Sequence, residues 1–179
     1  AEGKLPEAST TLREILENTA KKEYSAQDRA NRGILLDRLG FLYRSNEQYD
    51  TAVDTFREFA AMDTDSAARA EAQIIDTYRV SRSFDKALEE SESAVKKFPD
   101  DRFITDARAM ALADAGRMDE AIAMTRKLLN GKNDVEVYIS LAQLNEKGKH
   151  YAEATNALDS ASKLAISKED KVNILFLRG

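Results

Sequence analysis

The chain has 179 residues, of which 42% are hydrophobic and 33% charged, and its formal net charge is −5. This composition is too apolar for a disordered chain and too charged for a membrane-embedded helix bundle. The lack of cysteine excludes disulfides and cysteine-ligated zinc, and the single histidine, His150, excludes any multi-histidine metal site. Glycine (seven) and proline (two) are scarce, which favours helices over folds built from many short turns.

The first predicted helix covers residues 5–18, where apolar side chains recur on one face at Leu5, Ala8, Leu12, Ile15 and Leu16. A longer helix is expected from Ser25-Ala26-Gln27-Asp28, which has the form of a capping box, to Tyr43. Near the other end, Ser167-Lys168-Glu169-Asp170 is a second match to the same form and predicts the start of a last helix there.

A short pattern recurs between these two capping sequences: an aromatic residue or Met, an acidic or small residue, one more residue, and Ala. Its alanines are Ala52, Ala87, Ala121 and Ala154, so the spacings are 35, 34 and 33 residues. Four copies at nearly constant spacing indicate an internal repeat. The copies read Tyr49-Asp50-Thr51-Ala52, Phe84-Asp85-Lys86-Ala87, Met118-Asp119-Glu120-Ala121 and Tyr151-Ala152-Glu153-Ala154.

Each copy divides into two helical patterns around a short polar break. The breaks lie at residues 45–48, 81–83, 116–117 and 148–150. Apolar residues before and after each break recur with a period of 3.6 rather than 2, which predicts helices and not strands. Loops this short force the two helices to pack antiparallel. Small residues are expected where the two helices approach most closely, at Gly40, Ala109 and Ala142 and at the four repeat alanines.

The set Leu39-Gly40, Tyr43, Tyr49, Ala52 and Phe56 resembles the signature of the tetratricopeptide repeat (TPR) family, whose unit has 34 residues. The resemblance implies an all-α fold, a right-handed superhelical α-solenoid of antiparallel helix pairs. We expect a single solenoid over residues 1–179. Its units are a half repeat at 5–24 with a second helix only, full repeats at 25–66, 67–101, 102–134 and 135–167, and the truncated start of a further repeat at 168–179.

The resemblance also implies that first-helix residues line a concave groove that binds a peptide segment or a partner helix. Basic residues gather early along this track and acidic ones late, which predicts a charge gradient that sets the direction of the bound segment. In the alternative interpretation, Phe41, Phe103 and Met110 pack against the next unit. The predicted partner-binding residues are Asp37, Phe41, Arg44, Arg69, Asp76, Arg79, Phe103, Asp106, Met110, Glu136, Ile139, Gln143 and Glu146, and Ile34 and Val80 occupy further groove positions.

No motif for catalysis stands out. His150 is expected to be an exposed turn residue, and the sequence has no Gly-rich phosphate loop and no nucleophile elbow. Acidic residues such as Glu89, Glu90 and Glu92 could supply a carboxylate pair for a glycosidase, although a solvated helix face is the simpler interpretation. We therefore expect a protein that is not an enzyme and that has no cofactor and no metal, with a carboxylate-only enzyme as the alternative.

The expected partner is a protein or peptide. The acidic net charge disfavours nucleic acid, and no apolar run reaches the length of about 18 residues that membrane insertion needs. We expect a soluble bacterial protein of the cytoplasm or periplasm, and a fragment of a longer repeat protein. The adjacent apolar residues Ile174, Leu175, Phe176 and Leu177 predict a homo-dimer through the C-terminal edge. The alternative function is accordingly a structural module that self-associates through its solenoid ends.

Overall fold

A computed structural model describes residues 4–62, 64–132 and 134–178, and within these ranges the chain forms ten helices and no strand. The all-α fold class predicted from the sequence is therefore confirmed. The helices divide into two compact units, one up to Ala107 and the other from Arg108 onward. The helices are α1 (Lys4–Asn18), α2 (Ala26–Ser45), α3 (Tyr49–Met62), α4 (Thr64–Val80), α5 (Phe84–Lys97), α6 (Arg102–Asp114), α7 (Met118–Arg126), α8 (Asp134–Lys147), α9 (Tyr151–Leu164) and α10 (Lys168–Leu177).

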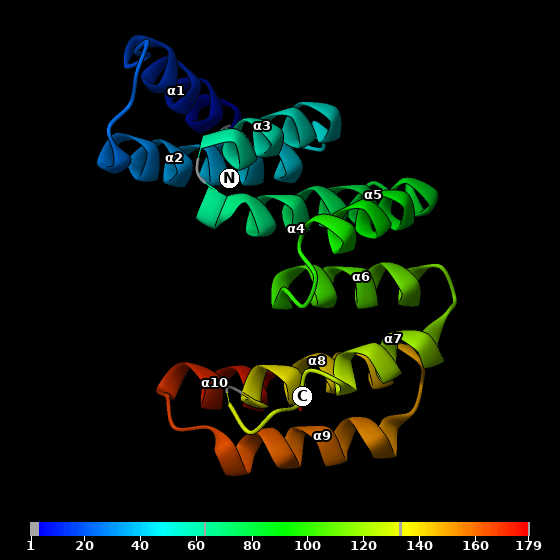
Figure 1. Ribbon diagram of the computed structural model, residues 1–179. Helices are drawn as coiled ribbons and strands as arrows, with labels where there is room; N and C mark the ends of the chain where they lie inside the picture. Colours follow the sequence, from blue (N-terminus) through cyan, green and yellow to red (C-terminus); the bar gives the residue numbers. More distant parts are fainter. Residues whose placement is uncertain (1–3, 63, 133, 179) are drawn as a thin grey trace. The chain divides into compact units, whose positions relative to one another are not determined.

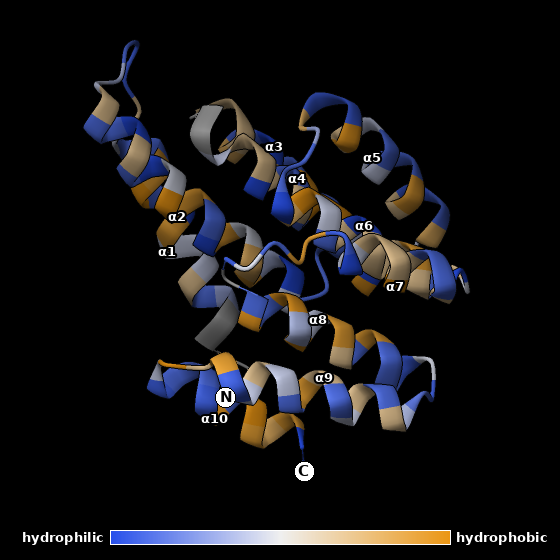
Figure 2. Cartoon of the chain, turned by 60° about the horizontal axis from the view of Figure 1, so that its bottom comes forward, coloured by the Kyte–Doolittle hydropathy of each residue, from blue (hydrophilic) through white to orange (hydrophobic). Residues whose placement is uncertain are grey.

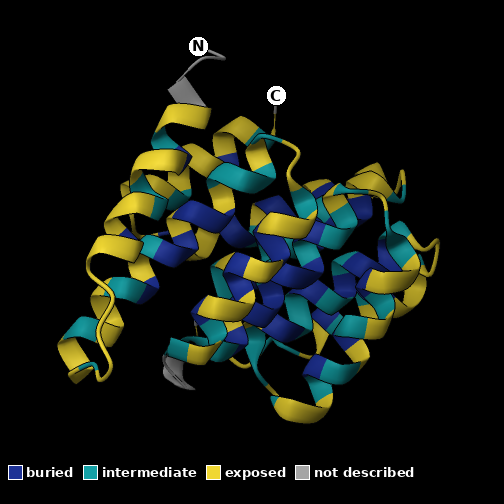
Figure 3. Ribbon diagram, turned by 90° about the horizontal axis from the view of Figure 1, so that it is seen from above, coloured by how far each residue is buried: buried dark blue, intermediate teal, exposed yellow. Residues whose placement is uncertain are grey.

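The first unit contains two antiparallel helix pairs, α2 with α3 and α4 with α5 (Figure 1). The single helix α1 packs on α2, and α3 also packs on α4. Buried and exposed residues alternate along the helices, as the colours of Figure 3 show. The centre of this unit's core consists of Leu16, Leu36, Leu39, Val53, Phe56, Phe59 and Ile74.

The second unit contains the end of α6 and the helices α7 to α10, with α8 and α9 as an antiparallel pair (Figure 1). Helix α7 packs on α8 and α10 packs on α9. The helix α7 has 9 residues, whereas α9 has 14. The turn that follows α7 is held by Asp134, whose carboxylate accepts hydrogen bonds from the backbone N–H groups of Asn130 and Gly131 at 3.1 and 2.9 Å. The core includes Val137, Ile139, Leu141, Leu158 and Ile174.

Four three-residue loops close the hairpins with one shared geometry. They span residues 46–48, 81–83, 115–117 and 148–150, where the sequence predicts the breaks. In each loop the middle residue has a positive φ, and the following N–H donates to the carbonyl five residues earlier at 2.7–2.9 Å. This is the Schellman arrangement, which satisfies the last carbonyls of the first helix. The middle residues, with their φ angles, are Glu47 (60°), Arg82 (62°), Gly116 (81°) and Lys149 (62°).

The repeat alanines are buried where the helices meet: Ala52, Ala87 and Ala121 are 0% exposed and Ala154 is 8% exposed. The expected close approach at Gly40 is also present, since an added Cβ there would lie 2.5 Å from the Phe56 ring. In later repeats other residues occupy these two positions. The equivalent pairs are Ile75 with Ser91, Ala109 with Thr125, and Ala142 with Leu158, all of them buried.

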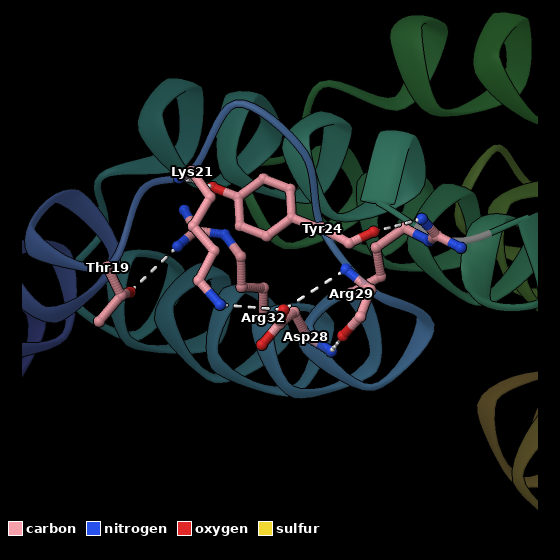
Figure 4. Close-up of polar contacts among 7 residues, drawn as sticks. Thr19, Lys21, Tyr24, Asp28, Arg29 and Arg32 are labelled. Atoms are coloured by element: carbon pink, nitrogen blue, oxygen red, sulfur yellow. Dashed lines mark hydrogen bonds and ion pairs between the residues drawn. The ribbon is translucent and has the colours of Figure 1, made fainter.

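The connection from α1 to α2 is fixed by polar contacts, shown in Figure 4. Ser25 and Asp28 form the predicted capping box at the start of α2. Arg32 donates to the carbonyl of Leu16 at 2.9 Å and to the hydroxyl of Thr19 at 3.1 Å, which ties the end of α1 to α2. Arg32 also lies over the Tyr24 ring, 4.9 Å from its centroid.

Candidate protein-binding surface

The first helices of the two pairs in the first unit, α2 and α4, contact each other and carry charged and apolar residues at the predicted groove positions. We call this set of residues the α2/α4 surface. It includes six of the predicted groove residues, and ion pairs join several of them. Arg69 of α4 contacts Asp37 of α2 at 2.5 Å, and Arg79 contacts Asp76 at 2.6 Å within α4. The residues of the α2/α4 surface are Ile34, Asp37, Phe41, Arg44, Arg69, Asp76, Arg79 and Val80.

Arg44 lies at the centre of the charges on this surface. Its guanidinium stacks over the Phe41 ring, 4.3 Å from the centroid. Burial lowers the pKa of Arg44, and the neighbouring charge of Arg79 lowers it further, while the carboxylates of Asp76 and Asp37 act in the opposite direction. Its buried Nη1 has no hydrogen-bond partner. Arg44 is thus a partly desolvated cation that stacks on an aromatic ring and is attracted by the charges of two carboxylates.

Large apolar side chains are exposed at the predicted groove positions of the first unit. Ile34 is 55% exposed, Val80 55% and Phe103, on α6, 58%. Phe41 is 41% exposed although one side of its ring packs edge-on against Phe56 with 6.3 Å between centroids. The contact with Phe56 lies within the repeat of Phe41 and not with the next unit, and Phe41 still presents apolar surface. Asp106 and Met110, also on α6, are half-buried.

The groove positions of the second unit have a different character. Ile139 is only 8% exposed and belongs to the core of this unit, so its side chain has little surface to offer a partner. Glu136 and Glu146 are exposed and Gln143 is half-buried. Gln143 and Glu146 border a cleft of about 370 Å³ between α8, α9 and the end of α10. The remaining residues that line this cleft include Tyr151, Thr155, Leu177 and Arg178.

In the acidic run on α5, Glu90 lies beside Glu71 of α4, a contact that the sequence did not predict. Glu89 and Glu92 are exposed, as a solvated face requires, but Glu90 is half-buried. Burial raises the pKa of Glu90, and the adjacent carboxylate of Glu71 raises it further. Glu71 itself is buried and accepts a hydrogen bond from Lys97 at 2.8 Å. These residues come from α4 and α5, so no spacing along one helix reveals the cluster.

His150 and the possibility of a metal site were the remaining candidates for chemistry. His150 is exposed, is the last residue of its loop, and makes no side-chain capping bond to α9. Among the residues that the structure describes, no group of three or more His, Cys, Asp or Glu side chains could hold a metal ion. Likewise, none of the helices in the described ranges combines the length and the hydropathy that crossing a membrane requires.

No protein-family model matches the sequence, and no curated protein does. Solved structures do match. TTC0263, a thermophilic TPR protein of Thermus thermophilus, aligns with a TM-score of 0.68 and 16% identity over 98% of this chain and 91% of that one. This chain has a TPR-like fold.

Two further solved structures also align with most of this chain. A Podosopora anserina protein with nearly identical TPR-like repeats has a TM-score of 0.56 and 18% identity, and the match covers 90% of this chain and 87% of that chain. BtubC (BKLC) from P. vanneervenii has a TM-score of 0.58 and 17% identity, with 90% and 73% covered. The resemblance to the TPR family drawn from the repeat signature is therefore confirmed at the level of fold.

Proposed function

We propose that this chain is a non-catalytic interaction scaffold that binds a segment of a partner protein on the α2/α4 surface, together with the exposed Phe103 of α6. One observation carries the proposal. Of the large apolar side chains that are exposed in the described part of the first unit, all but Ile15 lie at first-helix groove positions. Exposed apolar side chains concentrated on one face, among charged residues, are typical of protein-interaction sites.

The chemistry of the surface fits this use. Aromatic and arginine side chains contribute most of the binding free energy at protein interfaces, and Phe41 and Arg44 are stacked on each other here. The stacking and the ion pair between Arg69 and Asp37 hold the side chains in place before a partner arrives, which lowers the entropy cost of binding. Three arginines face two aspartates, so the surface favours a segment that carries apolar side chains and at least one carboxylate.

The test uses two substitutions at exposed positions, where folding is least affected. The double variant Ile34→Asp/Val80→Asp removes apolar contact area from the α2/α4 surface. Partners captured from the source organism by the wild-type chain should be identified, purified and measured by titration calorimetry. We expect the double variant to weaken the measured affinity at least tenfold. The loss of two exposed apolar contacts, at about 1 kcal/mol each, accounts for this change.

The matched control is Ile166→Asp, an apolar-to-acidic change at a side chain that is 90% exposed and lies outside the α2/α4 surface. It should bind the same partner with wild-type affinity. Equal affinities for all three proteins, with unchanged helix content, would show that the partner binds elsewhere and would refute the proposal.

A further inference from the structure

We propose that two copies of this 179-residue chain associate head to tail, with α1 of one copy packing against α10 of the other as the second helix of a repeat. The proposal goes beyond partner binding on the α2/α4 surface, because it uses neither the residues of that surface nor another protein. It rests on the repeat types of α1 and α10, on the exposure of their apolar residues, and on their charges.

Helix α1 has the pattern of a second helix. Its residues Ala8, Leu12 and Ile15 have the spacing of Ala52, Phe56 and Phe59 in α3. In α3 these three are fully or nearly buried, and Phe56 and Phe59 lie against Gly40 and Gly33 of α2.

The same stripe is partly open on α1, where Ala8 and Leu12 are half-buried and Leu12 packs on the core of the unit. Ile15 is 41% exposed, whereas Phe59 at the equivalent position is 3% exposed. Thr11 is exposed, whereas the equivalent Thr55 is 0% exposed. Helix α1, which packs on α2, therefore keeps part of a second-helix stripe uncovered at Thr11 and Ile15.

Helix α10 has the complementary character of a first helix. Ser167 caps its N-terminus, as Ser25 caps α2. Ile174, at the position of Leu39, is 2% exposed and joins the core, as Leu39 does. The next residue, Leu175, occupies the position at which Gly40 meets Phe56 and is 68% exposed.

The apolar residues near this open side of α10 are unusually exposed for a helix that packs on a neighbour. Val172 is 56% exposed and Phe176 82%. Figure 2 shows hydrophobic residues on α10 and on the segment that leads into it. A packed second helix is what covers this side in the pairs α2/α3, α4/α5 and α8/α9.

The charges of the two helices select α1, rather than a second α10, as the occupant. Glu7, Glu14 and Glu17 are exposed on α1, while Lys168, Glu169 and Lys171 are exposed on α10, so the exposed charges of α10 are positive on balance. A contact between α1 and α10 joins unlike charges, which favours association and fixes its direction. Two α10 helices placed face to face would instead bring the lysines of both copies to the same interface.

The two surfaces differ, so the contact is heterologous: each pair of copies keeps one open α1 and one open α10. The assembly should therefore grow with protein concentration. Because the contacts of Arg32 hold α1 on α2, α1 can present its stripe without leaving its own copy. This separates the proposal from domain swapping, in which α1 would detach.

The decisive experiment blocks one surface at a time and then mixes the variants. Ile15→Asp blocks α1, and Leu175→Asp/Phe176→Asp blocks α10. Mass is measured by analytical ultracentrifugation over a range of concentrations. We expect the wild type to form dimers and larger species and each variant alone to be monomeric. An equal mixture of the two variants should form a dimer and nothing larger, because only one intact pair of surfaces remains. Ile34→Asp, on the α2/α4 surface, is the control and should assemble like the wild type.

Charge reversal supplies a second measurement that does not depend on the folding of Ile15→Asp. Glu14→Lys/Glu17→Lys should weaken the assembly several-fold, and mixing this variant with Lys168→Glu/Lys171→Glu should restore the assembly.

A monomeric wild type at every concentration would overturn the proposal. So would wild-type assembly of Ile15→Asp combined with a monomeric Leu175→Asp/Phe176→Asp, because that outcome shows symmetric pairing of α10. Loss of partner binding by Ile34→Asp/Val80→Asp with normal assembly would leave the two proposals separately tested.

Discussion

The ring of Phe56 fills the space beside Gly40: an added Cβ at Gly40 would lie 2.5 Å from one ring carbon and 2.6 Å from another. The two residues belong to the two helices of one repeat, so this contact sets how closely α2 and α3 approach. In the next repeat the large and small residues exchange places, with Ile75 on the first helix and Ser91 on the second, both 0% exposed. A buried contact at this position therefore does not require a glycine on the first helix.

The first prediction concerns this pair. Gly40→Ala should reduce the free energy of unfolding by about 1–3 kcal/mol, because the new methyl group overlaps the Phe56 ring. Phe56→Leu in the same chain should recover part of that loss, since a smaller side chain leaves room for the methyl group. The measurement is a double-mutant cycle by urea unfolding. Strictly additive effects of the two substitutions would show that Gly40 and Phe56 are not coupled.

The second prediction concerns the hairpin loops. Lys149 has a φ of 62°, a conformation that favours glycine, whereas the equivalent Gly116 has 81° and no such cost. Lys149→Gly should therefore stabilise the chain by about 1 kcal/mol, and Gly116→Ala should destabilise it by a similar amount. Both changes are measured by thermal unfolding. Lys147→Gly, inside the last turn of α8, is the control and should destabilise. A loss of stability in Lys149→Gly would contradict the interpretation of the loop geometry.

The third prediction follows from the raised pKa of Glu90. The folded chain holds a proton on Glu90 more readily than the unfolded chain does, so the cost of ionising Glu90 appears as pH rises above the ordinary carboxyl value of 4.5. Glu90→Gln removes this cost. Relative to the wild type, the variant should gain stability as pH rises from below 4.5 through the raised pKa to neutrality, with little difference at the acidic end. Urea unfolding across this range measures the effect.

Glu92→Gln serves as the comparison for this pH series, because Glu92 is exposed on the same helix. Its stability should follow the wild type at every pH. If Glu90→Gln also followed the wild type at every pH, the proximity of Glu90 to Glu71 would have no energetic consequence.

The repeat period explains why so much of the fold could be predicted. Alanines spaced by 35, 34 and 33 residues, with helical patterns on both sides of a polar break, place each helix and each loop. The Ser25 capping box likewise places the start of α2. These are local signals, because capping and helical periodicity depend on residues within one or two turns.

Specific side-chain contacts between helices of different repeats could not be predicted from the sequence. A position within a repeat tells which helix face a residue occupies, but it does not give the partner on the next helix. The pairing of Asp37 with Arg69 joins α2 to α4, and Ile139 is buried although its position marks it as a groove residue. The loop geometry at Lys149 was also hidden, since only one of the four equivalent loops has a glycine at the middle position.

The last prediction concerns the attachment of α1. Arg32 is the side chain that joins both Leu16 and Thr19 of the first segment to α2. Arg32→Ala should cost about 1 kcal/mol in the local stability of α1, because a charged hydrogen bond to a backbone carbonyl is lost. Amide hydrogen exchange within α1 should then become roughly fivefold faster, while exchange in α8 and α9 stays unchanged. Arg29→Ala, which removes only a hydrogen bond of 2.8 Å to the Tyr24 carbonyl, should have a smaller effect on exchange.

If α1 is also the helix that meets α10 of a second copy, Arg32→Ala should weaken assembly as it raises the amide exchange rate of α1. Faster exchange with wild-type assembly would show that the position of α1 on α2 is irrelevant to association.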